Sequence, residues 1–162
     1  MFNIYGKDIY QTMNINHKTI PAANVDDKYT LFFDGCSKGN PGKAGAGAVL
    51  YRTNFHKTEL IEIWSASEFV GLKQTNNYAE YMGLLLGLAE AGRKCLPNLL
   101  VKGDSLLVIK QMQGVYKVNA PHLLPLYQQA CVLVKSIGRV DFEHVYRTEN
   151  KRADALANEA LI

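Results

Sequence analysis

At positions 29–42 the sequence is Tyr29-Thr-Leu-Phe-Phe-Asp34-Gly-Cys-Ser-Lys-Gly-Asn-Pro-Gly42, and its character changes at Asp34. The residues before Asp34 are aromatic, aliphatic or β-branched and predict a short strand. From Asp34 to Gly42 the chain is rich in glycine, asparagine and proline and predicts a loop. Asp34 would then lie at the carboxyl end of a strand, the edge of a sheet at which ligands gather.

The segments after this stretch change from strand-like to helix-like patterns. Residues 44–51 are small and apolar and predict a buried strand, and residues 59–67 alternate and predict another. Residues 54–57 are the expected turn between them. Apolar residues then recur every three or four positions from 75 to 92, which predicts a long helix that ends at a glycine.

The second half of the chain continues the alternation of strands and helices. Its expected elements are a strand, two helices, a strand and a final helix, at 99–101, 104–112, 121–136, 140–145 and 150–161. Three strands ahead of the first helix predict an α/β fold with a mixed sheet flanked by helices. Tyr51, Trp64 and Phe69 are expected in the core, and His144 is expected to be structural.

Composition indicates one globular domain. The chain has 162 residues, of which 48% are apolar, so it is long enough to bury a core. Residues 1–27 show no sustained period and are expected to form an N-terminal extension, which leaves 28–162 as the functional domain. The net charge of +3 is compatible with a polyanionic partner and equally with an ordinary solvated surface.

The cysteines Cys36, Cys95 and Cys131 are odd in number and widely spaced, without the spacing of a zinc site. A reduced, intracellular protein is therefore expected, with the cytoplasm as its location and an organelle left open. No apolar run approaches the roughly 20 residues of a membrane span, and no secretory signal is recognisable. No membrane partner is expected.

Three carboxylates stand at positions that favour a functional reading. Asp34 and Asp104 each follow an apolar strand, although a turn before Gly35 and a helix N-cap are the respective alternatives. Glu80 lies in a helix that is apolar almost all round. Burial of a lone carboxylate there would cost several kcal/mol unless a cation or hydrogen bonds compensate. The alternative for Glu80 is an exposed side chain beside small residues.

A fourth carboxylate, Asp154, lies at the edge of the apolar stripe of the last helix, where pairing with Lys151 on a solvated face is the alternative. The four acids together make a stronger case than any one of them. Carboxylate oxygens suit Mg²⁺ and Mn²⁺, whereas cysteine and histidine would suit zinc. Two such ions can clamp a phosphodiester and generate a hydroxide.

From residue 29 to the end, the sequence resembles a type 1 ribonuclease H. The stretches that carry the resemblance occur in the order and at the spacing of that family. They are the opening stretch 29–42, Thr75-Asn-Asn-Tyr-Ala-Glu80, Gly103-Asp-Ser-Leu-Leu-Val108 and Arg147-Thr-Glu-Asn-Lys-Arg-Ala-Asp-Ala-Leu-Ala157.

The resemblance implies a five-stranded mixed sheet of order 3-2-1-4-5 and hydrolysis of the RNA strand of an RNA–DNA hybrid. Two Mg²⁺ ions would be needed, with Mn²⁺ as a substitute, and the products would carry 5′-phosphate and 3′-hydroxyl ends. By this resemblance, Asp34 would bind both ions, and Glu80 and Asp104 would act on the nucleophile side. Asp154 would hold the ion near the leaving group, and Glu80 would also contact a ribose 2′-hydroxyl.

The resemblance also implies a set of substrate-binding residues. They are Gly35, Ser37, Asn40, Asn76 and Asn77. Glycine allows the backbone to approach a nucleic-acid strand closely, and asparagine amides can donate to and accept from ribose and base edges. Helix capping by Thr75 or Asn76 is the alternative for the two neighbouring asparagines, and both roles can hold together.

The sequence departs from some bacterial members of the family. Residues 111–121 are too few for the basic protrusion that those members carry, and residues 145–150 are too few for their histidine-bearing loop. Arg147 stands in the place of that loop, as in the protrusion-less, archaeal-like members. Its guanidinium could hold a phosphate or aid product release, and pairing with Glu149 on the surface is the alternative.

The leading hypothesis is therefore a metal-dependent endonuclease, expected as a monomer, whose partner is an RNA–DNA hybrid and which is open to double-stranded RNA as a second substrate. A catalytically inactive binding module of the same fold is an alternative from another class, although all four acids are present. The nuclease part of a reverse-transcribing element is a third reading, in which residues 1–27 would be a linker.

Overall fold

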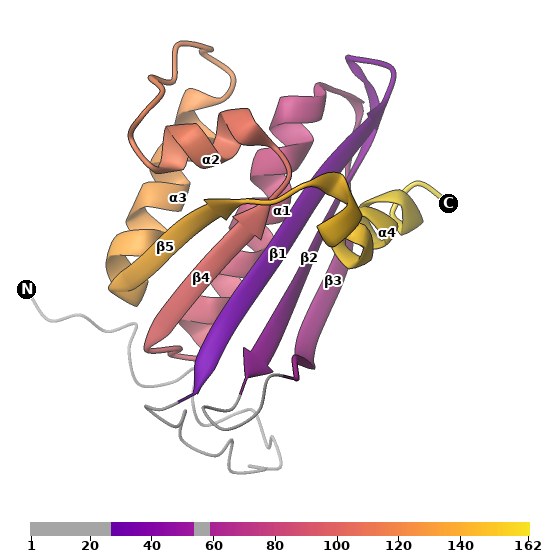
Figure 1. Ribbon diagram of the computed structural model, residues 1–162. Coiled ribbons are helices and arrows are strands. Elements are labelled where there is room, and N and C mark those ends of the chain that lie inside the picture. The colour runs from indigo at the N-terminus through magenta and orange to yellow at the C-terminus, as the bar shows by residue number, and fades with distance from the viewer. Residues whose placement is uncertain (1–26, 54–58) are drawn as a thin grey trace, which may run out of the picture.

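In the computed structural model, which describes residues 27–53 and 59–162, strand β1 (Lys28–Lys38) lies at the centre of a five-stranded sheet (Figure 1). Strand β2 (Gly42–Thr53) pairs with it in antiparallel fashion, and β3 (Ile61–Gln74) pairs antiparallel with β2. These three strands form the meander that the sequence predicts ahead of the first helix.

Two parallel strands complete the sheet on the other side of β1. Helix α1 (Asn76–Arg93) crosses over to β4 (Asn98–Gly103), and β4 pairs in parallel with both β1 and β5 (Arg139–His144). The resulting strand order, β3-β2-β1-β4-β5, confirms the predicted order 3-2-1-4-5. The sheet is mixed because crossover helices permit parallel neighbours, whereas short turns join antiparallel ones.

Helices cover both faces of the sheet. Helix α1 packs on β1 and β2, and α3 (Leu124–Ile137) packs against α1 and β5. Helix α2 (Leu106–Met112) lies beside α1, β4 and β5. On the opposite face α4 (Lys151–Glu159) crosses β1 and β2 after a single turn of 3-10 helix, Arg147–Glu149 (Figure 1). Across the described residues, every helix falls short of the length and apolar character that a membrane crossing requires.

The apolar residues divide into two cores, one on each face. The larger includes Phe33, Tyr81 and Leu84 between the sheet and α1, and all three are fully buried. The smaller lies under α4 and includes Val49 and Ala153. Residues of one strand alternate between the two cores because successive side chains point to opposite faces of the sheet.

The predicted loop at 34–42 was wrong. Strand β1 continues through Asp34 to Lys38, so only Gly39, Asn40 and Pro41 separate it from β2. The partner strand is rich in glycine and alanine here, with Asp34 opposite Gly47. Small residues on β2 leave room for the ladder to continue, although glycine and asparagine depress strand propensity.

Other boundaries differ from the sequence predictions in smaller ways. Strand β3 extends past the predicted end at 67 to Gln74, where Phe69 lies 46% exposed rather than in the core, because β3 is an edge strand. Helix α3 begins at Leu124, so Pro125 rather than Pro121 occupies its first turn. The predicted turn at 54–57 and nearly all of the predicted extension lie outside the described residues.

Candidate active site

Asp34 and Asp104 meet where the parallel pairing of β1 with β4 ends. The pairing of β1 with β4 stops at Phe33 opposite Gly103, and each acid is the next residue in its chain segment. Asp34 is only 5% exposed. The N-cap of α2 is Ser105, whose hydroxyl accepts from the Val108 amide, so the capping alternative for Asp104 is wrong and its carboxylate is free for another use.

Glu80 reaches the same place from helix α1, and two glycines explain how. A Cβ on Gly35 would lie 2.1 Å from the Ala79 carbonyl carbon, and one on Gly83 would lie 2.4 Å from the Asp34 carbonyl oxygen. The helix can therefore approach β1 more closely than any side chain would permit. Glu80 is 4% exposed and its Oε2 has no hydrogen-bond partner, so the alternative of an exposed glutamate is wrong.

One oxygen from each of Asp34, Glu80 and Asp104 lies within 4.8 Å of the other two. Burial raises the pKa of Asp34 from 3.8 to about 7, and the nearby charge of Asp104 adds to this. Burial, followed by the charges of Asp34 and Asp104, holds the pKa of Glu80 well above its ordinary value. Three crowded acids with an unpartnered buried oxygen are the arrangement that a divalent cation would stabilise.

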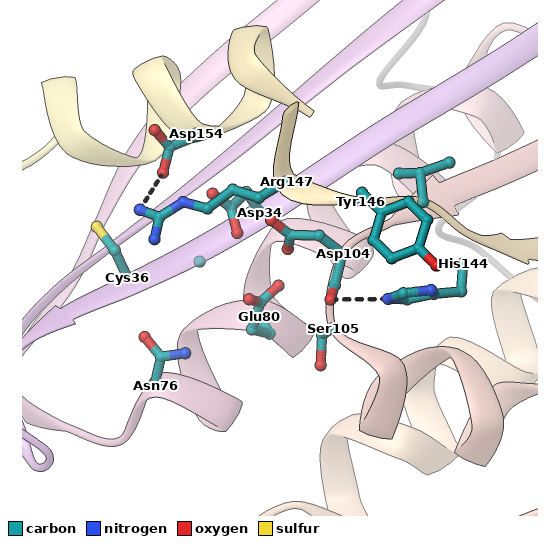
Figure 2. A pocket seen from close by; sticks show the side chains of 12 residues that line it. Asp34, Cys36, Asn76, Glu80, Asp104, Ser105, His144, Tyr146, Arg147 and Asp154 are labelled. Carbon is teal, nitrogen blue, oxygen red and sulfur yellow. Dashed lines mark hydrogen bonds and ion pairs between the residues drawn. The ribbon is translucent and has the colours of Figure 1, made fainter. Parts of the chain in front are cut away.

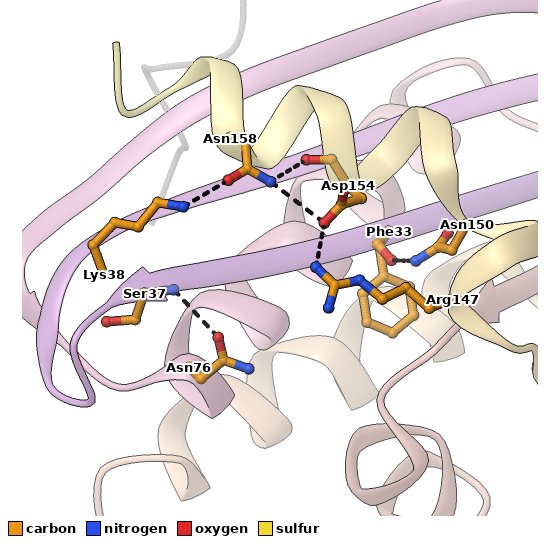
Figure 3. A network of polar contacts seen from close by, with 8 residues as sticks. All are labelled: Phe33, Ser37, Lys38, Asn76, Arg147, Asn150, Asp154 and Asn158. Carbon is orange, nitrogen blue, oxygen red and sulfur yellow. Dashed lines mark hydrogen bonds and ion pairs between the residues drawn. The ribbon is translucent and has the colours of Figure 1, made fainter.

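Asp154 extends from α4 toward the other three acids and lines the same pocket (Figure 2). Its Oδ1 pairs with Arg147 Nη2 at 3.4 Å and also accepts from Asn158 Nδ2 at 3.3 Å (Figure 3). Pairing with Lys151 is therefore not what the structure shows. Nor does Arg147 pair with Glu149, because Glu149 accepts from the Tyr146 amide instead.

The pocket has a volume of about 400 Å³ and is polar around its acids. Arg147 bends over the pocket from the 3-10 turn (Figure 2). Burial raises the pKa of Asp104, and the Arg147 guanidinium opposes that shift. The pocket therefore combines acids from β1, α1, α4 and the residue after β4 with one cation on its rim. Such an arrangement suits a phosphodiester, whose oxygens can meet both metal ions and a guanidinium.

The predicted substrate residues are only partly brought together. Gly35 and Asn76 line the pocket. Asn76 Oδ1 accepts from the Ser37 amide at 3.2 Å, and the Asn76 amide donates to Asn40 Oδ1 at 3.0 Å, which ties the β1–β2 turn to the start of α1. Asn77 is half-buried in the first turn of α1, outside that network and outside the pocket lining.

The capping alternative is resolved by Thr75, whose hydroxyl accepts from the Tyr78 amide at 3.2 Å. Because Thr75 is the N-cap of α1, Asn76 is not needed for capping, and its side chain is exposed. Its side-chain NH₂ remains available at the mouth of the pocket, beside its bond to Ser37 (Figure 3).

The sequence predictions gave no site role to three residues near the acids: His144, which was expected to be structural and lines the pocket, and Asn150 and Asn158, which lie outside the pocket lining. His144 places Nε2 3.2 Å from the Asp104 carbonyl oxygen, Asn158 contacts Asp154, and Asn150 donates to the Phe33 carbonyl. Asparagine ahead of a helix is the usual N-cap residue, so its presence at 150 is no signal of another role. A histidine in an alternating strand is likewise an ordinary pattern.

The family model described as reverse transcriptase-like matches residues 32–160. Among curated proteins, the bifunctional protein Rv2228c of Mycobacterium tuberculosis is 43% identical over 134 residues, which cover 83% of this chain. The same match covers 35% of that relative, so the chain spans about a third of its length.

Three solved ribonuclease H structures match this chain over most of their own length. The N-terminal RNase H domain of Rv2228c has a TM-score of 0.76 and 40% identity, and covers 83% of this chain and 93% of that one. RNase H1 of Halobacterium salinarum has a TM-score of 0.75 and 36% identity, with coverage of 83% and 97%. LC11-RNase H1, solved in complex with an RNA/DNA hybrid, has a TM-score of 0.73 and 35% identity, with coverage of 82% and 96%.

Proposed function

The chain belongs to the reverse transcriptase-like family and to its type 1 ribonuclease H members, and on that premise we propose that it is an endonuclease that hydrolyses the RNA strand of RNA–DNA hybrids. The observation that carries the proposal is the convergence of Asp34, Glu80 and Asp104 within 4.8 Å of one another in an open pocket. The hybrid bound to LC11-RNase H1 supports the choice of substrate.

Asp34, Glu80, Asp104 and Asp154 would hold two divalent cations, with Mg²⁺ as the physiological choice and Mn²⁺ as a substitute. The donor set is made of oxygens alone, and the unpartnered Oε2 of Glu80 leaves one buried ligand atom unused by the protein. Bound cations of this kind supply a water of lowered pKa and neutralise charge on the phosphate. The carboxylates fix where that chemistry takes place, because β1, α1 and α4 carry three of them and the fourth directly follows β4.

Discrimination between RNA and DNA would rest on the residues around the β1–β2 turn. The backbone at Gly35 and the side-chain amide of Asn76 face the pocket, where they can meet a ribose 2′-hydroxyl. Ser37 and Asn40 hold Asn76 in place through the two bonds to its side chain and its backbone amide. Asn77 would contact the substrate from the first turn of α1.

Arg147 would bind the phosphate and would not transfer a proton. A guanidinium stays charged at every physiological pH, so it cannot act as a general base. In the structure it is paired with Asp154 and its side chain is 79% exposed, which leaves it free to move onto a phosphate oxygen. Its position on the rim supports a role in substrate binding or product release.

A cleavage assay tests the proposal. One end-labelled RNA strand is incubated as a hybrid, as duplex RNA and alone, with Mg²⁺, Mn²⁺ or EDTA. We expect internal cuts in the hybrid that vanish with EDTA and leave 3′-hydroxyl ends, and the duplex-RNA lane sets the breadth of the activity. Intact RNA in every lane, with a folded protein, would reject the enzyme and favour a binding module of the same fold.

The functional domain would comprise residues 28–162, with residues 1–27 as an extension to it, and the protein would act as a monomer. Strand β1 begins at Lys28, which supports this boundary. Removal of residues 1–27 should leave the cleavage rate within about twofold, and light scattering of the active protein measures its mass. The reason is that all four acids of the site lie within residues 28–162.

A further inference from the structure

Asn150 is the most deeply buried polar side chain among the described residues, at 1% exposure, and the hydrophobic cores do not account for it. It is the N-cap residue of α4, yet its side chain makes no capping hydrogen bond. Its Oδ1 is buried without a hydrogen-bond partner. A polar group held in this state costs about 1–3 kcal/mol, so its retention calls for a use elsewhere.

That use lies with the strand that carries Asp34. Asn150 Nδ2 donates to the Phe33 carbonyl oxygen at 2.9 Å (Figure 3). Phe33 is the last β1 residue paired with β4 and immediately precedes Asp34. The amide therefore satisfies a carbonyl at the point where the parallel ladder ends, and it holds the backbone from which the Asp34 side chain projects.

The same residue also bonds to a second acid of the site through its backbone. The Asn150 carbonyl oxygen accepts from the Asp154 amide at 3.0 Å, in the first turn of α4. One buried residue thus links β1, at the point where its pairing with β4 ends, to the start of α4.

We infer that Asn150 is a positioning residue that fixes Asp34 and Asp154 relative to one another for metal binding and cleavage. It acts through the backbone of Phe33 and the first turn of α4, and it does not line the pocket. The inference rests on the proposed function. Groups that orient the ligands of a metal site commonly change metal affinity or activity by about 10–100-fold when removed.

Two substitutions separate positioning from helix capping. Asn150→Ala removes the amide, whereas Asn150→Ser keeps a residue that is favoured as an N-cap but is too short to reach the Phe33 carbonyl. The matched control is Gln111→Ala in α2. Gln111 is also a buried amide, 4% exposed, and accepts from the Tyr81 hydroxyl at 2.6 Å, but it lies outside the pocket.

The experiment measures Mn²⁺ affinity by calorimetry, the melting temperature in EDTA, and kcat and KM on a hybrid. All three variants should melt earlier than the wild type. Only the Asn150 variants should lose about 10–100-fold in Mn²⁺ affinity and a similar factor in kcat, with KM for the hybrid changed less than threefold. Asn150→Ser should be the more stable of the two and equally impaired.

Mn²⁺ affinity and kcat in Asn150→Ser that match those of Gln111→Ala would overturn the inference and leave Asn150 a structural residue. The metal titration does not depend on turnover. If the wild type binds Mn²⁺ but cuts no hybrid, the proposed function fails, while the titration of the Asn150 variants still decides whether this residue positions the acids.

Discussion

Asp34 is the acid on which the others converge, because Glu80, Asp104 and Asp154 all act on its carboxyl group. Asp34→Asn keeps the size of the side chain but removes its charge, so hybrid cleavage should fall below detection with Mg²⁺ or Mn²⁺. The protein should remain folded, because a neutral amide relieves the repulsion among buried acids. Gel assays and circular dichroism check both parts, and a cleavage rate near that of the wild type would reject the assignment.

Arg147 tests the rim of the pocket. Its ion pair with Asp154 spans 3.4 Å, and with a side chain that is 79% exposed it should contribute less than about 1 kcal/mol to stability. Arg147→Ala should therefore slow steady-state turnover by about tenfold or more while the free energy of unfolding changes little.

Arg147→Lys is the matched variant for this test. It retains the charge but lacks the planar fork that binds two oxygens, so it should restore only part of the rate. Single-turnover and steady-state kinetics together separate chemistry from product release. An unchanged steady-state rate in Arg147→Ala would make Arg147 an ordinary surface charge.

At the scale of elements, the site depends on how closely helices approach the central strands. On the face opposite α1, a Cβ on Gly47 would lie 2.5 Å from the Ala153 carbonyl oxygen and 2.6 Å from the Ala157 amide nitrogen. Gly47→Ala should displace α4, which carries Asp154, because backbone atoms cannot give way as side chains do. We expect a loss of about 1–3 kcal/mol in stability and a fall in kcat.

Gly92→Ala is the control for this prediction. Gly92 lies near the end of α1, where the nearest atom to an added Cβ is Ile137 Cγ1 at 3.9 Å. Alanine there should be neutral or stabilise the helix by up to about 1 kcal/mol, with kcat unchanged. Thermal unfolding of both variants measures the contrast, and equal stability of the two would show that α4 does not need the contact at Gly47.

Periodicity was sufficient to predict the order of elements but not the extent of each one. The helix of α1 follows from apolar residues at three- and four-residue spacing, and the burial of Glu80 follows from its apolar neighbours. The continuation of β1 beyond Asp34 could not be predicted, because it depends on the glycine and alanine residues of β2 opposite it. Likewise, the role of Asn150 depends on the Phe33 carbonyl, which is 117 positions away in the chain.

At the scale of the whole molecule, the fold holds acids together against their mutual repulsion. The pKa of Asp34 is about 7 in the folded protein against an ordinary value of 3.8, and the pKa values of Glu80 and Asp104 are raised as well. Between about pH 4 and pH 7 the folded state therefore binds more protons than the unfolded chain. The free energy of unfolding must then fall as the pH rises through this window.

The stability of the metal-free protein should accordingly decrease from about pH 4 to about pH 7, by an amount on the order of a few kcal/mol. Asp34→Asn should flatten this dependence, because one of the raised carboxyl groups is gone. Saturating Mn²⁺ should restore stability most at the higher pH, where the acids are ionised and can bind it. Melting curves in EDTA and in Mn²⁺ across this range measure all three effects. If the stability of the wild type and of Asp34→Asn changed with pH in parallel, Asp34 would titrate like an exposed acid. Repulsion among crowded carboxylates would then not explain why cations stabilise the protein.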